Sequence, residues 1–222
     1  MSDVRQTSAM QVIATTLADG NCATLLDVGC GSGVLKPHIE KLGVRWTGVD
    51  PDVTDEAPKI SAAGAEDLPF ASGQFDSVLF LNSLHHVPVE QMSQALRESL
   101  RVLAPGRGPV IVIEPAVEGD LSELLRHVDD ETSVRRAAQS ALSLVIQQGL
   151  ARASDAYDYI RNERYDGFND FATRLAQADS WRTKALTQNR ELLLKDFNRL
   201  ATHTERGFIL RQPMKVTILM LP

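Results

Sequence analysis

One short segment constrains the fold more than any other: a hydrophobic run that contains an acidic residue and leads directly into a glycine-rich turn. Residues Leu25–Val28 form the run, Asp27 is its acid, and Gly29, Gly31 and Gly33 punctuate the turn. Glycine adopts positive φ angles readily and has no Cβ to obstruct a ligand. Because open α/β sheets bind ligands at the carboxyl ends of their parallel strands, this segment predicts a ligand site on a parallel sheet.

Up to residue 115, short β-rich runs alternate with helical stretches. This order is typical of parallel strands joined by crossovers. A helix is predicted over residues 88–103, where apolar residues recur on one face behind a proline in the first turn. Residues 51–58 are too short and too rich in Pro and Asp for a full helix, so the second crossover is expected to be a loop or a single turn. The predicted strands are Thr24–Val28, Arg45–Val49, Lys59–Ala62, Phe75–Leu81 and Pro109–Glu114.

From about residue 117 the strand pattern gives way to helical periodicity. We therefore predict an α/β fold: a doubly wound, mostly parallel, Rossmann-like sheet of seven or nearly seven strands, with a helical insertion after the fifth strand. Residues 1–116 form the predicted core and 117–206 the insertion. Residues 207–222 complete the sheet through two β-like runs about Pro213, as a hairpin or as paired strands.

Aromatic residues are concentrated in one part of the predicted insertion. All three tyrosines of the chain lie within residues 157–181. The simplest explanation is helix packing, since Phe168, Phe171 and Leu175 follow helical spacing. A substrate lid is an alternative, because aromatic walls suit an apolar or aromatic acceptor, and a homodimer face is a third. The cluster consists of Tyr157, Tyr159, Tyr165, Phe168, Phe171 and Trp181.

Composition and charge exclude several classes of protein. The 222 residues are 43% hydrophobic and 23% charged, as in ordinary globular domains. With 23 Lys and Arg against 29 Asp and Glu, the net charge of −6 disfavours nucleic acid as a partner. No apolar run approaches the roughly 20 residues that cross a bilayer, and the N-terminus leads into no apolar signal segment, which predicts no membrane span and a cytoplasmic location.

The cysteine and histidine pattern predicts neither a disulfide nor a metal. The two cysteines, Cys22 and Cys30, flank an extended run that would hold them too far apart to be bridged. Most histidines are scattered, and the chain has no Cys-x-x-Cys pair. The acidic group at residues 129–131 is more typical of a solvated face than of a metal site.

A second acid, Asp50, follows the next predicted strand and should lie beside the glycine turn. A carboxylate there can accept hydrogen bonds from ribose hydroxyls, as nicotinamide and S-adenosylmethionine nucleotides both require. The glycine spacing decides between them. Residue 34, where the dinucleotide fingerprint places its third glycine, is Val34, which disfavours pyrophosphate binding.

Five motifs in this order resemble the class I S-adenosylmethionine-dependent methyltransferases, most closely the branch that acts on small molecules, quinones and lipids. They lie within residues 24–115, about half of the chain, whereas residues 117–206 resemble no family that we identify. The motifs are Asp27–Gly33, Gly48–Asp50, Ala65–Phe70 followed by Gln74–Val78, Leu84–Val87, and Arg101–Gly106.

The resemblance implies S-adenosylmethionine as the cofactor and a role for each matching position. The glycines would line the methionine moiety, Asp27 would hold its amino group and Asp50 the ribose. In the family an acid precedes Ala65 and contacts the adenine; here that residue is Gly64, which leaves the adenine to the Ala65 backbone and to Glu66 or Asp67. Two residues, Leu81 and Asn82, would form the floor beneath the methyl group. The implied cofactor-binding residues are Asp27, Gly29, Cys30, Gly31, Gly33, Asp50, Pro51, Ala65, Glu66, Asp67, Leu81 and Asn82.

Methyl transfer from a sulfonium depends mainly on the in-line positioning of a nucleophile. A general base helps when that nucleophile is a hydroxyl, and His86 and His85, directly after a predicted strand, are the candidates. If they continued the strand they would face opposite sides of the sheet. A capping or packing role for both is the alternative. Glu114, which closes the fifth predicted strand, either contacts substrate or is held by local backbone donors.

The predicted function is transfer of a methyl group from S-adenosylmethionine to a hydroxyl, carbon or amine of a small molecule. Two alternatives stay open. The first, which Gly64 leaves open, is a methyltransferase-like binding or regulatory protein without turnover. The second is a nicotinamide-dependent oxidoreductase, which Val34 and the Ala65–Phe70 segment disfavour. After Leu81 the chain lacks the Asn/Asp-Pro-Pro-aromatic signature of enzymes that methylate bases, which also points away from DNA.

Overall fold

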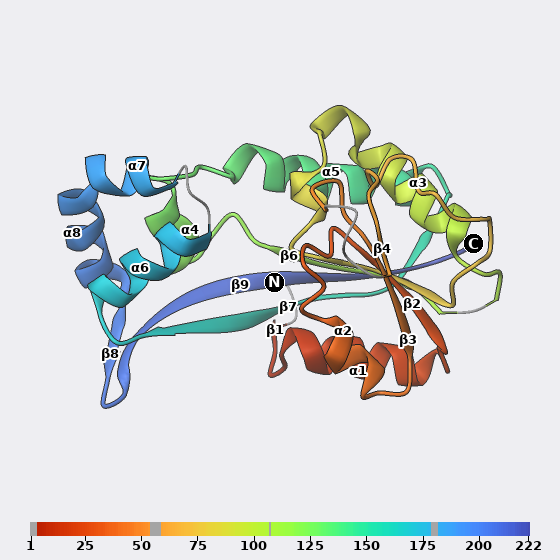
Figure 1. The fold of residues 1–222 in the computed structure, drawn as a ribbon, viewed down its shortest axis with the longest axis horizontal. Helices are drawn as coiled ribbons and strands as arrows, with labels where there is room; N and C mark the ends of the chain where they lie inside the picture. Colours follow the sequence, from red (N-terminus) through yellow and green to blue (C-terminus); the bar gives the residue numbers. More distant parts are fainter. Residues whose placement is uncertain (1–3, 54–58, 107, 179–181) are drawn as a thin grey trace. The chain divides into compact units, whose positions relative to one another are not determined.

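The computed structural model describes residues 4–53, 59–106, 108–178 and 182–222 (Figure 1). The chain divides into two compact units. Unit 1 comprises Met1–Glu114, Val134–Tyr159 and Lys215–Pro222, and unit 2 comprises Pro115–Ser133 and Ile160–Met214. Two long strands, β7 (Arg152–Tyr165) and β9 (Gly207–Met220), each begin in one unit and end in the other.

The centre of unit 1 is a parallel sheet. Strand β2 (Thr24–Val28) lies between β3 (Arg45–Val49) and β5 (Ser77–Leu81), parallel to both. The sheet continues in parallel through β6 (Val110–Pro115) on one side and β4 (Ile60–Ser61) on the other.

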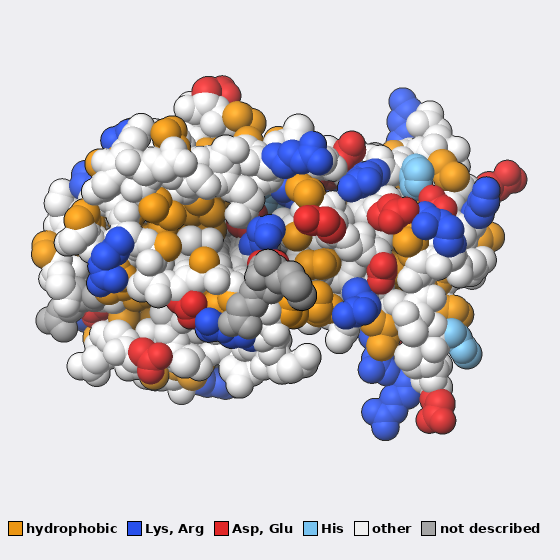
Figure 2. All heavy atoms as spheres, turned by 180° about the vertical axis from the view of Figure 1, so that it is seen from behind, with side chains coloured by type: hydrophobic (Ala, Val, Ile, Leu, Met, Phe, Trp, Pro, Cys, Tyr) orange, Lys and Arg blue, Asp and Glu red, His pale blue; other side chains and the backbone are white. Residues whose placement is uncertain are grey.

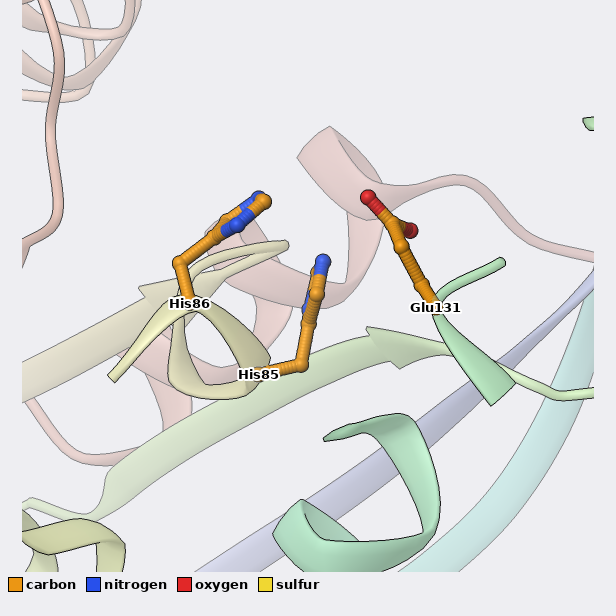
Figure 3. Close-up of side chains that lie close together, drawn as sticks. All are labelled: His85, His86 and Glu131. Carbon is orange, nitrogen blue, oxygen red and sulfur yellow. The ribbon is translucent and has the colours of Figure 1, made fainter. Parts of the chain in front are cut away.

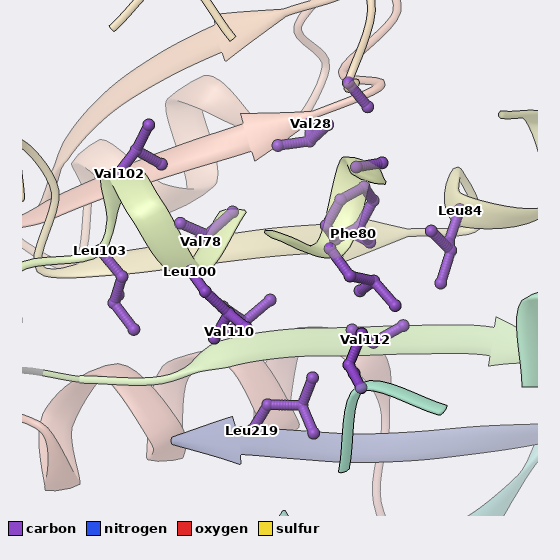
Figure 4. Close-up of a cluster of buried hydrophobic side chains, with 14 of the residues drawn as sticks. Val28, Val78, Phe80, Leu84, Leu100, Val102, Leu103, Val110, Val112 and Leu219 are labelled. Carbon is purple, nitrogen blue, oxygen red and sulfur yellow. The ribbon is translucent and has the colours of Figure 1, made fainter. Parts of the chain in front are cut away.

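Within the described residues the sheet has nine strands rather than the predicted seven or nearly seven, in the order β1-β7-β9-β6-β5-β2-β3-β4, with β8 paired to β9. Strand β1 (Val4–Arg5) is parallel to β7, and β8 (Thr202–Thr204) is antiparallel to β9. Figure 4 shows β9 running opposite to β6. The prediction of a mostly parallel Rossmann-like sheet is thus confirmed.

Helices cover both faces of the parallel strands, as the doubly wound prediction requires. On one face lie α1 (Ala9–Asp19) and α2 (Lys36–Glu40), and on the other α3 (Met92–Val102) and α5 (Thr132–Gln147) (Figure 1). Helix α1 begins where the side chain of Ser8 accepts a hydrogen bond from the Gln11 N–H, an ordinary N-cap. The predicted helix over 88–103 is α3 with a short 3₁₀ turn, η2 (Val89–Gln91), before it.

The core of unit 1 follows from strand alternation. Successive side chains of a strand point to opposite faces, so every second residue of β2, β5 and β6 packs toward α3 and α5. Burial on both faces explains why these strands read as nearly continuous apolar runs. Each such side chain contributes about 1.5–3 kcal/mol when fully buried. The strand members of this core include Leu26, Val28, Val78, Phe80, Val110 and Val112 (Figure 4).

Unit 2 has its own small aromatic core. Phe171 lies 5.4 Å from Tyr165 and 5.7 Å from Phe197, measured between ring centroids. Phe168 is 5.8 Å from Phe197, so the predicted helix-packing role holds for the residues of this cluster that lie in unit 2. The helices of unit 2 are α4 (Asp120–Leu125), α6 (Phe168–Ala178), α7 (Arg182–Gln188) and α8 (Arg190–Leu200).

The rest of the predicted aromatic cluster lies elsewhere. Tyr157 and Tyr159 are on the part of β7 that belongs to unit 1, where the Arg5 guanidinium carbon lies 3.7 Å from the centroid of the Tyr157 ring. Trp181 lies outside the described residues, as does most of the predicted loop at 51–58.

Two predictions about the second half of the chain are wrong. The segment expected to be wholly helical contains β7, a 14-residue strand whose Tyr157, Tyr159 and Tyr165 are buried among polar neighbours. The sequence of β7 lacks the apolar run by which buried strands are recognised, because a half-exposed strand carries fewer apolar residues. The expected hairpin about Pro213 is also absent, since a single strand, β9, runs through Pro213 and the turn instead joins β8 to β9.

Candidate functional site

The candidate site lies where β2, β3 and β5 end at the same edge of the sheet. After β2, Gly29, Gly31 and Gly33 have φ angles of +72°, +53° and +77°, which favour glycine. The Gly29 N–H donates to the Val49 carbonyl at 2.8 Å, so the loop is closed over the end of β3. We call residues 29–33 the glycine loop.

The glycines of this loop are required for different reasons. A Cβ on Gly29 would lie 2.5 Å from the Cβ of Ser83, a distance that real Cβ atoms do not tolerate. A Cβ on Gly31 would meet nothing within 4 Å. Gly29 therefore allows two segments of the protein to pack, whereas Gly31 leaves open space beside the backbone.

Asp50 binds the glycine loop from the tip of β3. Its Oδ2 accepts a hydrogen bond from the Gly31 N–H at 2.7 Å, and its Oδ1 accepts one from the Asp52 N–H at 3.0 Å. The neighbouring Pro51 is exposed. The structure therefore brings the second acid into direct contact with the glycine turn, as the strand order predicted.

Asp27 is a buried acid, with 2% of its surface exposed. Its Oδ2 accepts a hydrogen bond from the indole N–H of Trp46 at 3.0 Å. Burial raises the pKa of Asp27 from 3.8 to about 6; the Trp46 hydrogen bond opposes this rise, and the negative charge of Asp50 adds to it. At neutral pH the carboxylate is ionised, at a cost to stability.

Asp27→Asn is expected to raise the free energy of unfolding by about 2 kcal/mol at pH 8 and by far less at pH 4. A raised pKa in the folded state adds stability that is fully present below pH 3.8 and is lost as pH rises through about 6. The uncharged variant escapes that loss. Urea unfolding of both proteins at the two pH values checks this, with the exposed Asp67→Asn as control. An offset of equal size at pH 4 and pH 8 would contradict it.

The two cysteines are both buried and are not bonded to each other. Burial raises the pKa of the Cys30 thiol to about 12, and the charges of Asp27 and Asp50 add to this. Cys30 is therefore a protonated, unreactive residue of the glycine loop.

The segment after β4 carries the residues predicted to contact the adenine. Ala65 is buried, Asp67 is exposed and Glu66 is half-buried. The Glu66 carboxylate lies against Gly64, at the place where a side chain on residue 64 would begin. The Glu66 carboxylate thus occupies the space that an acidic side chain at position 64 would enter.

Helix α3 fixes this segment in place. Glu98 accepts a hydrogen bond from the Leu68 N–H at 3.0 Å. Arg101 donates to the Phe70 carbonyl at 2.8 Å and to the Leu68 carbonyl at 3.0 Å, and it pairs with Glu98 at 2.7 Å. The motif that begins at Arg101 therefore supports the motif at 65–70 directly, a link that the motif order alone could not reveal.

Asn82, at the end of β5, has two unusual features. Its φ of +54° is in the left-handed region, which costs energy for a residue with a side chain. Its buried side-chain oxygen Oδ1 has no hydrogen-bond partner within the described part of the chain. Leu81 is half-buried beside it. Strain and an unpartnered polar atom together are typical of a functional position.

The histidine pair does not continue the strand. Residues Leu84–His86 form a short 3₁₀ turn, η1, so the expectation of opposite faces was wrong. The two rings lie side by side with centroids 4.1 Å apart (Figure 3). His85 is 4% exposed, whereas His86 is exposed.

Glu114 holds His85 and the turn that carries it. The Nδ1 atom of His85 contacts Oε2 of Glu114, which is 1% exposed. The other oxygen, Oε1, accepts hydrogen bonds from the Ser83 N–H at 3.0 Å and the Leu84 N–H at 2.9 Å. Of the two roles weighed for Glu114, the structure shows the acid held by local backbone donors.

The charge distribution on the surface and the character of the helices bear on the expected partners. On the face shown in Figure 2, Lys and Arg side chains lie among Asp and Glu side chains rather than in a continuous basic field. Within the described ranges, no helix combines the length and the apolar character that a bilayer crossing demands.

Residues 26–108 match the family model described as a methyltransferase domain. An uncharacterized methyltransferase of Mycobacterium leprae is 40% identical over 92 residues, covering 37% of this chain and 34% of the relative. A ubiquinone biosynthesis O-methyltransferase of Methylobacterium is 33% identical over 95 residues, 37% of each chain. The crystal structure of BH2331 from Bacillus halodurans aligns with a TM-score of 0.62 at 14% identity, covering 96% of this chain and 98% of that one.

The sheet order, the glycine loop and the acids at the strand tips define a Rossmann-like methyltransferase fold of class I. Residues 26–108 are therefore similar to methyltransferase domains, in agreement with the resemblance to S-adenosylmethionine-dependent enzymes found in the motifs. The chain spans about a third of the length of the curated relatives that it matches.

Proposed function

We propose that this protein transfers a methyl group from S-adenosylmethionine to a small-molecule acceptor. The observation that carries the proposal is the meeting of three features at one edge of the sheet: the glycine loop, Asp27 and Asp50. Open space beside Gly31 and two carboxylates suit a ligand that combines a ribose with cationic groups. The methyltransferase match of residues 26–108 supports the same cofactor.

Each part of the site has a proposed task. Asp50 exchanges its contacts with the loop for the ribose hydroxyls, and Asp27 faces the amino group of the methionine moiety. The glycine loop, which includes Cys30, and the neighbouring Pro51 line the cofactor site. When bound, S-adenosylmethionine supplies the methyl group from its sulfonium. The chain contributes binding and in-line positioning, which can account for roughly 7–11 kcal/mol of a reaction barrier.

We assign the adenine to the segment at 65–67. Glu66 is the best acceptor for the adenine amino group, because its carboxylate fills the space beside Gly64. Its half-buried position keeps it accessible to a ligand, and the α3 contacts hold the segment rigidly. We assign Leu81 and Asn82, at the end of β5, to the floor beneath the transferred methyl group, where the unpartnered Oδ1 of Asn82 can accept a hydrogen bond from a ligand.

His86 is the proposed general base, with His85 as its support. His85 is buried and engaged by Glu114, whereas His86 is exposed and its ring lies beside that of His85, with centroids 4.1 Å apart and ring planes tilted by 39°. An exposed imidazole can exchange its proton with solvent after each turnover. Glu114 accepts hydrogen bonds from the Ser83 and Leu84 N–H groups at the start of the turn that carries both histidines. It therefore helps to position His86.

The acceptor is proposed to be a small molecule, apolar or aromatic. Curated relatives include a norajmaline N-methyltransferase of Rauvolfia and the ubiquinone biosynthesis O-methyltransferase named above. Unit 2 lies wholly outside the matched residues 26–108, and we propose that it determines which acceptor is used.

The proposal is tested by incubating the protein with methyl-labelled S-adenosylmethionine and a panel of apolar aromatic alcohols and amines. Transfer of label to an acceptor, with matching formation of S-adenosylhomocysteine, is the expected result. Binding of the cofactor without transfer to any acceptor would instead favour the non-catalytic alternative that Gly64 suggested.

His86→Ala is expected to slow methyl transfer to a hydroxyl acceptor by about 100-fold or more, without weakening the affinity for S-adenosylhomocysteine. Loss of a base removes proton transfer but leaves the cofactor contacts intact. Initial rates and calorimetric titration measure the two effects separately. His38→Ala, which removes an exposed histidine on α2, is the control. An unchanged rate for His86→Ala would assign His86 a structural role.

A further inference from the structure

Trp46 connects the buried acid of the site to the glycine loop. The residue lies in β3 and is 2% exposed. Its indole N–H donates to Asp27 at 3.0 Å. The ring also fills the space beside two glycines, because a Cβ on Gly48 or Gly33 would lie 2.5 Å or 3.1 Å from its Cη2 atom. The ring is therefore held in one orientation, with its N–H aimed at the carboxylate.

Asp27 depends on this single donor. Among the residues that the structure describes, Trp46 is the only hydrogen-bond donor to its carboxylate, and no Lys or Arg pairs with it. The groups that face it are Asp50, which carries the same charge, and Cys30, whose thiol is protonated. Of the described groups around Asp27, only Trp46 therefore favours the ionised carboxylate. This matters because an ionised group is costly to bury without partners.

We propose that Trp46 is a positioning residue for cofactor binding: its indole N–H keeps the Asp27 carboxylate ionised and oriented to receive a cationic amino group. The inference rests on the proposed function, since it assumes that this amino group belongs to S-adenosylmethionine. A hydrogen bond to an ionised acceptor is about twice as strong as one between neutral groups, so the indole N–H selects the carboxylate over the carboxylic acid. The direction in which Trp46 moves the pKa of Asp27, downward against burial, agrees with this.

If Trp46 keeps Asp27 ionised, replacing Trp46 should change how the affinity for the cofactor depends on pH. Protonated Asp27 does not attract an ammonium group, so affinity should fall about tenfold per pH unit below the pKa of Asp27. Without the indole N–H, that pKa should rise by about one to two units. The affinity loss in a variant should therefore be large near neutral pH and small in alkali.

The test measures the dissociation constant of S-adenosylhomocysteine by calorimetry between pH 5 and pH 8.5. It compares the wild-type protein with Trp46→Phe and with a protein that carries 3-benzothienylalanine at position 46. The second replacement keeps the volume of tryptophan and lacks only the N–H, so it carries the test if Trp46→Phe does not fold. Asp27→Asn provides the profile without a titrating acid.

We expect both replacements at position 46 to bind roughly 5- to 50-fold more weakly at pH 6 and about 2- to 10-fold more weakly at pH 7, and to approach wild-type affinity at pH 8.5. Asp27→Asn should bind weakly at every pH. A constant loss across the pH range, or no loss, in the benzothienyl protein would overturn the inference while leaving the cofactor assignment intact. Absence of binding by the wild-type protein at every pH would instead overturn the proposed function.

Discussion

Asp50→Ala is expected to weaken the binding of S-adenosylhomocysteine by at least about 100-fold while the protein stays folded. Each hydrogen bond to a charged acceptor contributes about 1.5–3 kcal/mol, and Asp50 is proposed to accept one from each ribose hydroxyl. A factor of 100 in the dissociation constant corresponds to about 2.7 kcal/mol, so the loss of these two bonds suffices. Calorimetric titration measures the affinity, and circular dichroism with thermal unfolding verifies the fold.

The variant also removes contacts of the ligand-free protein, so a matched control is needed. Asp50 bonds the Gly31 and Asp52 N–H groups, and their loss alone could disorder the glycine loop. Asp50→Asn keeps one acceptor oxygen for the loop but replaces the other with a donor. We expect it to bind more weakly than wild type and more tightly than Asp50→Ala. Equal affinity in all three proteins would sink the assignment of Asp50 to the ribose.

Gly29→Ala is expected to lower the free energy of unfolding by about 3 kcal/mol and to abolish cofactor binding. The φ of +72° costs an alanine about 1–2 kcal/mol. Overlap with Ser83 adds about 1–3 kcal/mol, because the new methyl group would lie 2.5 Å from the Ser83 Cβ. Denaturant unfolding and calorimetry measure the two effects.

Gly31→Ala is the matched control, since it has a positive φ of +53° but open space around the added methyl group. It should cost about 1–2 kcal/mol of stability, from the backbone strain alone. It should still impair binding, because the methyl group would occupy the space proposed for the ligand. Equal loss of stability in the two variants would show that the Ser83 contact is unimportant.

The parallel core could be predicted well because its physical signals are local. Strands β2 and β3 have the bounds expected from their apolar runs, since burial on both faces leaves little room for polar residues. The glycines and acids of the site were found for the same reason, because each stands directly at a strand end. The strand β7 was missed because its buried tyrosines alternate with Asp, Arg and Glu.

The rest of the candidate site depends on contacts between residues distant in the chain. Trp46 gave no functional signal, because a tryptophan in a β-rich run looks like ordinary core until its indole N–H is seen to meet Asp27. Glu114 approaches His85 only after β5 and β6 pair. The positive φ of Asn82 has a weak sequence signal, since asparagine tolerates the left-handed region better than most residues.

The most direct test of the central proposal is calorimetric titration of the purified wild-type protein with S-adenosylmethionine, S-adenosylhomocysteine and NADH in parallel. We expect both sulfur nucleotides to bind and NADH to give no heat, because the glycine loop and Val34 do not fit a pyrophosphate. Binding of NADH alone, or of none of the three, would contradict the assignment of the glycine loop, Asp27 and Asp50 to S-adenosylmethionine.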